Sequence, residues 1–170
     1  MGSILLAREL PESGGDTLFA SMYAAFDALS DGFKRTLESL RAVHSNRHVF
    51  GAAGAYRQQE DTRETFTNAH LVGDAIHPVV ITHPESGRKA LYVNPAFTVQ
   101  FEGWTPEESR PLLEALHRHA VRPEFTCRFR WQPGSIAFWD NRCTWHYASN
   151  DYQGQRRLLH RITVGGVALH

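Results

Sequence analysis

The chain has 170 residues, with 18 lysines and arginines against 18 aspartates and glutamates, so its formal net charge is zero. This length predicts a single domain, residues 1–170, that buries about two-thirds of the surface of its unfolded chain. Acidic and basic residues are interspersed, which excludes the basic stripe of a nucleic-acid-binding protein and the acidic tail of a disordered one. The composition therefore favours a small-molecule partner.

Two cysteines, Cys127 and Cys143, are too few for a disulfide scaffold. The first residues include neither a basic region nor a long apolar run, so the sequence predicts no membrane segment and no secretion signal. We therefore expect a reducing, cytoplasmic environment.

The first third of the chain predicts a strand followed by two helices. Residues 3–7 are apolar and suited to a strand, and residues 11–15 form a glycine-rich turn. Residues 21–29 and 31–43 carry aromatic and leucine side chains at helical spacing, with Ser30 as the cap between the two segments.

Residues 44–70 show no apolar periodicity, which predicts a long surface loop or a lid over a site. His44, His48 and His70 lie in or beside this segment. Histidines in a polar loop are usually solvated, so the sequence favours no metal-binding role for them.

Residues 77–82 and 89–94 predict a hairpin around the turn at residues 84–87. His83 and Glu85 form the only H-x-[DE] pair in the sequence, and a 2-His-1-carboxylate iron site uses such a pair with a distal histidine. The proline between them and the Ser-Gly that follows favour a structural turn over a pair of metal ligands.

The next segment predicts a helix and then a strand. Thr105 is a cap and Pro106 the first helical residue, and the helix runs to Ala120. After Pro123 ends this segment, apolar and polar residues alternate over residues 125–131, a pattern typical of a half-buried strand.

Residues 138–163 concentrate the candidate functional side chains. The pattern predicts strands at 135–139, 143–148 and 156–164, with a turn at 140–142 and a loop at 149–154. His146 falls in the second strand and Arg157 on a neighbouring strand, so both can enter one cavity. An imidazole can bind iron and a guanidinium can hold a carboxylate with two hydrogen bonds. A purely structural alternative remains: a hydrogen-bonded core histidine and arginines paired with nearby acids.

Four blocks of sequence carry a resemblance to a known family. They are W-D-N-R-x-T-x-H-Y-A at residues 139–148, Q-R-R-x-x-H-R at 155–161, G-G-D-T at 14–17 and H-P-V-V-x-T-H-P-x-S-G at 77–87. They resemble the TauD/TfdA family, the taurine-dioxygenase-like Fe(II)- and 2-oxoglutarate-dependent oxygenases. The resemblance implies an α+β fold with a double-stranded β-helix core, a jelly roll of the clavaminate synthase-like kind, with flanking helices.

The resemblance also implies roles for individual residues. Thr17 and Arg157 match the positions that bind 2-oxoglutarate, and His146 matches the distal iron ligand. Arg161 is the candidate for binding the sulfonate or carboxylate of the substrate, and Phe50 resembles an aromatic residue that lines the substrate pocket.

The implied activity is hydroxylation of a small organic acid or sulfonate, with release of succinate and CO2. The family's H-x-D iron-ligand motif precedes the G-G-D-T turn and does not occur in this sequence. We therefore expect an N-terminally truncated chain that binds Fe(II) weakly and that forms a homo-oligomer through unpaired edges of strands 3–7 and 125–131. The alternative is an inactive remnant that binds an anion or only oligomerises.

Overall fold

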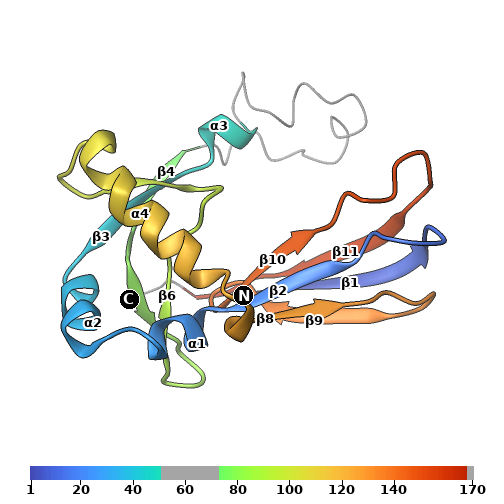
Figure 1. Cartoon of the computed structure of the whole chain (residues 1–170), viewed down its shortest axis with the longest axis horizontal. Coiled ribbons are helices and arrows are strands. Elements are labelled where there is room, and N and C mark those ends of the chain that lie inside the picture. Colours follow the sequence, from blue (N-terminus) through green and yellow to red (C-terminus); the bar gives the residue numbers. More distant parts are fainter. Residues whose placement is uncertain (51–72, 168–170) are drawn as a thin grey trace.

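The computed structural model describes residues 1–50 and 73–167, and Figure 1 shows their arrangement in two parts. One part consists of strands β1 (Gly2–Glu9), β2 (Thr17–Ser21), β8 (Thr126–Phe129), β9 (Ile136–Asp140), β10 (Thr144–Ala148) and β11 (Leu158–Val164). The other contains helices α1 (Met22–Asp27), α2 (Asp31–Glu38), α3 (Arg47–Phe50) and α4 (Pro106–Ala120) with strands β3 (Arg41–Ser45), β4 (Asp74–Pro78), β5 (Val80–Thr82), β6 (Lys89–Leu91) and β7 (Thr98–Phe101). A short 3-10 helix, η4 (Pro123–Phe125), precedes β8.

Six strands form two antiparallel sheets, with the orders β11-β1-β9 and β10-β2-β8. Consecutive strands β9, β10 and β11 therefore alternate between the sheets. The prediction that the strands of residues 143–148 and 156–164 are neighbours was wrong, because β10 and β11 lie in different sheets and pair with the central strands β2 and β1. Strand β1 is also paired on both sides, so the expected unpaired edge at residues 3–7 was wrong, whereas β8 does lie at an edge.

The two sheets face one another across aromatic side chains. Phe19 of β2 lies directly opposite His146 of β10, so both side chains point to the same side of their sheet. The ring of Trp139, from β9 in the other sheet, lies 5.2 Å from the ring of Phe19 and 4.8 Å from that of His146. The inner layer of this sandwich thus includes a candidate functional histidine.

The second part differs from the sequence prediction at two places. Helix α2 ends at Glu38 rather than Val43, because the residues that follow pair as β3 with both β4 and β7. His44 therefore lies in β3 and His48 in α3, so the first part of the predicted loop was wrong. The remainder of that prediction, including His70, lies outside the described residues.

Other predicted elements are confirmed. Helix α4 begins after Thr105, whose side chain accepts the Glu108 N–H while Glu108 binds the Thr105 N–H in return. The helix buries Leu113 and Leu116 against the core and packs on β7. Strands β5 and β6 form the predicted hairpin over a shorter length, with the turn closed by the hydrogen bond from Gly87 N to His83 O at 2.8 Å. The inclusion of residues 77–78 in its first strand was wrong, because they belong to β4 and pair with β3. None of the helices in the described part of the chain combines the length and apolarity needed to cross a bilayer.

The core of the second part gives a test of this packing. Phe101 of β7 is fully buried among the residues that α4 covers, so Phe101→Ala should destabilise the protein by about 3–5 kcal/mol through lost contacts and a residual cavity. Val99→Ala, at an exposed position of the same strand, should change the free energy of unfolding by less than about 0.5 kcal/mol. Urea unfolding followed by circular dichroism measures both; equal losses would contradict the assigned core.

Candidate functional site

The G-G-D-T turn before β2 is built around an arginine. Gly14 and Gly15 have φ values of +80° and +71°, which favour glycine. Gly15 donates its N–H to Asp151 Oδ1 at 2.7 Å, and Arg157 Nε donates to Gly15 O at 2.9 Å. A Cβ at Gly15 would lie only 3.0 Å from Arg157 Cδ and Nε. The glycine therefore lets the guanidinium approach the backbone two residues before Thr17.

Thr17 and Arg157 both present polar atoms in a buried setting. Thr17 is 1% exposed, and its Oγ1 accepts a hydrogen bond from Trp131 Nε1 at 3.0 Å. Arg157 Nη2 is buried and has no hydrogen-bond partner among the described residues, while its guanidinium lies 5.7 Å from the ring centre of Tyr152. A buried N–H without a partner costs free energy, which an anionic ligand would recover. The suggested pairing of Arg157 with an acid is not present in the described part of the chain.

His146 lies on β10 at an exposed position, with its ring beside Trp139. Partial desolvation, together with the positive charge of Arg161, lowers the pKa of His146 below its usual value of 6.5. The imidazole is therefore neutral at pH 7 and has a lone pair to offer a metal ion.

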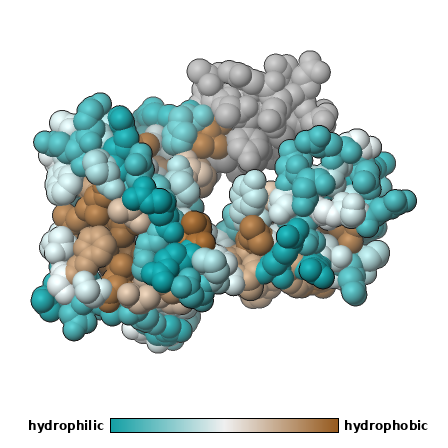
Figure 2. Space-filling model, in the orientation of Figure 1, coloured by the Kyte–Doolittle hydropathy of each residue, from teal (hydrophilic) through white to brown (hydrophobic). Residues whose placement is uncertain are grey.

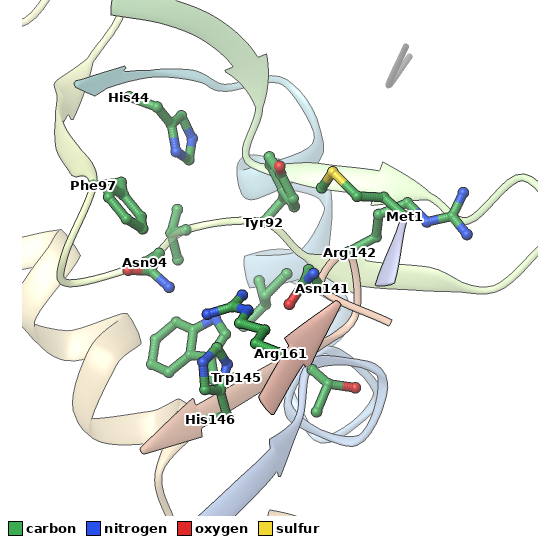
Figure 3. Close-up of a pocket in the computed structure, with 13 residues that line it drawn as sticks. Met1, His44, Tyr92, Asn94, Phe97, Asn141, Arg142, Trp145, His146 and Arg161 are labelled. Carbon is green, nitrogen blue, oxygen red and sulfur yellow. The ribbon is translucent and has the colours of Figure 1, made fainter. Parts of the chain in front are cut away.

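A pocket of about 280 Å³ lies where the two parts of the molecule meet (Figure 3). His146 and Arg161 line it from the sandwich, and His44, Tyr92 and Phe97 from the other side. Figure 2 shows the surface hollowed between the two parts. The structure thus brings His146 and Arg161 together in one pocket, which Arg157 does not line. At the turn before β2, Arg157 contacts Gly15, and Thr17 contacts Trp131.

Sequence reasoning missed His44 as a residue of this pocket. Its Nδ1 lies 3.3 Å from Thr98 Oγ1, and its ring contacts the rings of His77 and Tyr92 at 5.3 and 5.4 Å. Desolvation, with the nearby His77 adding to it, lowers the pKa of His44 to about 4. Strand β3 has only 5 residues, which is too few to recognise an alternation of apolar and polar side chains in the sequence. The side chain of Phe50 lies outside the described part, so its predicted contact with a substrate stays a prediction.

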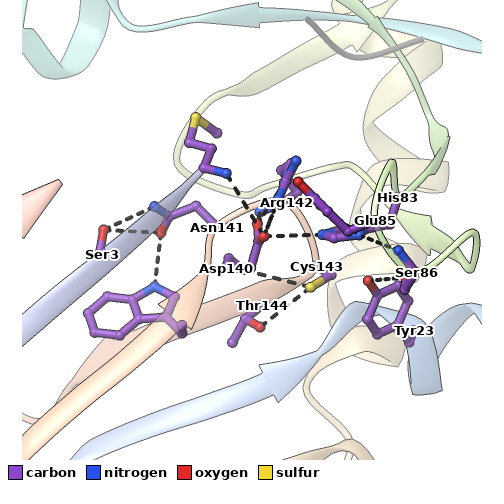
Figure 4. Close-up of polar contacts among 12 residues, drawn as sticks. Ser3, Tyr23, His83, Glu85, Ser86, Asp140, Asn141, Arg142, Cys143 and Thr144 are labelled. Atoms are coloured by element: carbon purple, nitrogen blue, oxygen red, sulfur yellow. Dashed lines mark hydrogen bonds and ion pairs between the residues drawn. The ribbon is translucent and has the colours of Figure 1, made fainter. Parts of the chain in front are cut away.

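Arg142 forms a charged network that joins the two parts (Figure 4). Its Nε donates to Asp140 Oδ1 at 2.9 Å, and its Nη2 donates to Glu85 Oε2 at 2.8 Å. Burial opposes ionisation of Asp140, but the hydrogen bonds from Arg142 and His83 outweigh it and hold the pKa of that carboxyl well below its usual range.

His83 belongs to the same network. Its Nε2 lies 3.1 Å from Asp140 Oδ2 and its Nδ1 lies 3.3 Å from Glu85 Oε2, so both ring nitrogens face carboxylates. Ligand atoms of His83, Asp140 and Cys143 come within 4.8 Å of one another, but Arg142 already neutralises the carboxylate. This geometry favours the structural interpretation of the H-x-E pair.

Comparison with known proteins identifies the family. Residues 1–163 match the family described as taurine catabolism dioxygenase TauD, TfdA family, and the chain belongs to this family. It is 39% identical over 167 residues to an alkylsulfatase of Acinetobacter baylyi and 38% identical over 167 residues to an alpha-ketoglutarate-dependent sulfate ester dioxygenase of Pseudomonas putida. These alignments cover 96% of this chain and 52% and 54% of the relatives, so the chain spans about half the length of the curated relatives it matches.

A solved structure supports the same assignment. The crystal structure of AAD-2 in complex with Mn(II) and N-oxalylglycine superposes with a TM-score of 0.81 at 34% identity, covering 98% of this chain and 64% of the other. The predicted jelly-roll core with flanking helices is confirmed by this likeness and by the family.

The lowered pKa of His44 predicts a dependence of stability on pH. Because the folded-state pKa of about 4 lies below the unfolded value of 6.5, the unfolded chain takes up the proton first as the pH falls. The stabilisation is complete above pH 6.5 and is lost as the pH falls towards 4. When the pH falls from about 7 to about 5, the free energy of unfolding should therefore fall by about 1–2 kcal/mol less in His44→Gln than in the wild type.

The control for this measurement is His160→Gln, at an exposed position of β11. Urea unfolding at both pH values should show the wild-type dependence in this variant. If His44→Gln retains the wild-type dependence instead, protonation of His44 is not coupled to unfolding.

Proposed function

We propose that the protein is an Fe(II)- and 2-oxoglutarate-dependent dioxygenase that oxidises a small sulfate ester, sulfonate or carboxylate and releases succinate and CO2. The observation that carries the proposal is the pairing state of two arginines. Among the described residues, no carboxylate pairs with Arg157 or Arg161, whereas Arg128 and Arg142 each pair with two and Arg156 pairs with one. Positive charges left without a carboxylate at a buried turn and in a pocket fit two anionic ligands.

The residues at the turn fit the carboxylate of 2-oxoglutarate. The unpartnered Arg157 Nη2 would donate to it, and the buried Thr17 hydroxyl lies two residues from the glycine that Arg157 contacts. When bound at an Fe(II) centre, 2-oxoglutarate supplies two of the electrons that reduce O2. The neutral imidazole of His146 fits one ligand of that iron. The similar structure of AAD-2 is a complex with Mn(II) and N-oxalylglycine, which is consistent with a metal and a dicarboxylate at such a site.

The pocket fits an anion that carries an apolar group. Arg161 provides the positive charge, and Phe97 lies on the opposite wall (Figure 3). Leu91 and Val93 also line the pocket. The two relatives named for sulfate esters support a substrate of this class. The chain's own residues would thus bind the anionic end at Arg161 and exclude water around the remainder.

The family and its relatives do not support the alternative of an inactive remnant better than they support a dioxygenase. The described residues offer His146 as one iron ligand, and the remaining two ligands of the site are not assigned among them. Weak binding of Fe(II) by this chain alone, like a cytoplasmic location, stays a prediction.

The assignment of Arg157 is tested by calorimetry with N-oxalylglycine in the presence of Mn(II). Arg157→Ala should weaken binding by about 2–5 kcal/mol, because a charge-assisted pair with a buried partner is lost. Arg157→Lys should be nearly as damaging, since lysine cannot supply the planar pair of donors. Arg156→Ala is the matched control, because Arg156 is 74% exposed and pairs with Glu9. Unchanged affinity in Arg157→Ala would show that the anchor is misassigned.

We further propose that the protein self-associates through the outer face of the β11-β1-β9 sheet. Ile136, Phe138 and Ile162 are 63%, 68% and 64% exposed, and Ile4 lies opposite both Phe138 and Ile162. These side chains form a continuous apolar surface across three strands, which pairing with a second copy would remove from water.

Light scattering at low micromolar concentration tests this proposal. We expect the wild type to be a dimer or a larger species and Phe138→Glu to be a monomer with an unchanged circular dichroism spectrum. Val121→Glu, at an exposed position after α4, should leave the assembly intact. A wild-type protein that is monomeric with a cooperative melt would refute self-association.

A further inference from the structure

Arg161 is held in the pocket by a serine from the first strand. Its Nη2 donates to Ser3 Oγ at 2.8 Å. Ser3 is 0% exposed, so this hydroxyl is a polar atom in the buried layer between the sheets. The contact joins residues 158 positions apart in the sequence.

The register of the sheet explains why the two side chains meet. Ser3 lies opposite Thr163 on β11, and Arg161 lies opposite Leu5, so Ser3 and Arg161 are diagonal neighbours. Ser3 also lies opposite Trp139 on β9. Residues two apart on a strand point to the same side, which places Ser3 and Arg161 on the inner face together with Trp139.

Ser3 is itself fixed by the turn after β9. Asn141 Nδ2 donates to Ser3 Oγ at 3.0 Å, and Asn141 Oδ1 accepts the Trp139 Nε1–H at 2.9 Å (Figure 4). Trp139 in turn contacts the ring of His146 at 4.8 Å. Hydrogen bonds therefore link Trp139, the turn and the guanidinium, and the ring contact of Trp139 extends this chain to His146, the candidate iron ligand.

The chemistry of the serine matters because it is neutral. A carboxylate at this place would hold the guanidinium equally well but would cancel its charge, as Asp140 does for Arg142. A hydroxyl orients the guanidinium through one nitrogen and leaves the positive charge available to a ligand. Fixing a flexible arginine before binding also lowers the entropy lost when an anion binds.

We propose that Ser3 is a positioning residue that holds the Arg161 guanidinium ready for the anionic group of the substrate. This inference rests on the proposed function of Arg161 as the substrate anchor. Ser3 acts through Arg161 and does not itself contact the substrate.

The test is the affinity for hexyl sulfate, measured by NMR titration of the full chain in Ser3→Ala, Arg161→Ala and the double variant. Ser3→Ala should weaken binding about tenfold, the factor expected for one hydrogen bond to a charged group. The double variant should bind no more weakly than Arg161→Ala, because the effect of Ser3 passes through Arg161. Thr163→Ala, opposite Ser3 on β11, should bind like the wild type.

A second measurement follows the guanidinium directly. The Arg161 Nε–Hε resonance, assigned by its absence in Arg161→Ala, should show faster rotation about the Nε–Cζ bond in Ser3→Ala than in the wild type. A role in packing alone would leave this rotation unchanged.

The outcomes separate the two proposals. If Arg161→Ala binds hexyl sulfate like the wild type, the substrate anchor is wrong and the role of Ser3 falls with it. If Arg161→Ala loses affinity while Ser3→Ala does not, the anchor stands and the positioning role is overturned. An equal loss on removing Ser3 with and without Arg161 also overturns it.

Discussion

The buried guanidinium of Arg142 joins the two parts of the molecule, and the pocket depends on that junction. Arg142 is 4% exposed and binds Asp140 at the end of β9 and Glu85 in the turn between β5 and β6. Removing a partner from a buried charge typically costs about 3–5 kcal/mol, and the more exposed Glu85 contributes less because water screens it. His83 adds a second contact to Asp140 from the same turn. These contacts join the sandwich that carries His146 to the part that carries His44.

The arginines of the junction and of the candidate sites fall into two groups, those paired with carboxylates and those held by neutral acceptors. Arg142 is surrounded by carboxylates and serves the fold, while Arg157 and Arg161 bind a backbone carbonyl and a hydroxyl instead. Neutral acceptors orient a guanidinium without removing its charge. The histidines in the pocket fit the same electrostatic pattern, since the lowered pKa values of His44 and His146 keep both neutral at pH 7. Met1 and Arg142 also line the pocket, but Asp140 lies beside the charges of both, so Arg161 is the positive group there that no carboxylate pairs with among the described residues.

The sequence predicted local features better than the pairing of strands. The cap at Thr105, the tight turn after His83 and the glycine turn before Thr17 are set by neighbouring residues, and all three formed as expected. Strand partners depend on contacts distant in sequence, so the alternation of β9, β10 and β11 between two sheets was not visible. The segment that follows α2 was assigned to the helix because the spacing of apolar residues over so short a segment fits both a helix and a strand.

The same limit explains which site residues could be found. His146 and Arg157 belong to motifs that a family resemblance identifies. The roles of Ser3 and His44, in contrast, depend on contacts with residues of other strands. Ser3 in particular is unremarkable in the sequence, because a serine in an apolar strand predicts nothing about charge. Its importance arises from the register, which places its hydroxyl beside a guanidinium that no acid neutralises in the described part of the chain. The functional geometry of this pocket is therefore a property of strand pairing as much as of the residues that bind ligands.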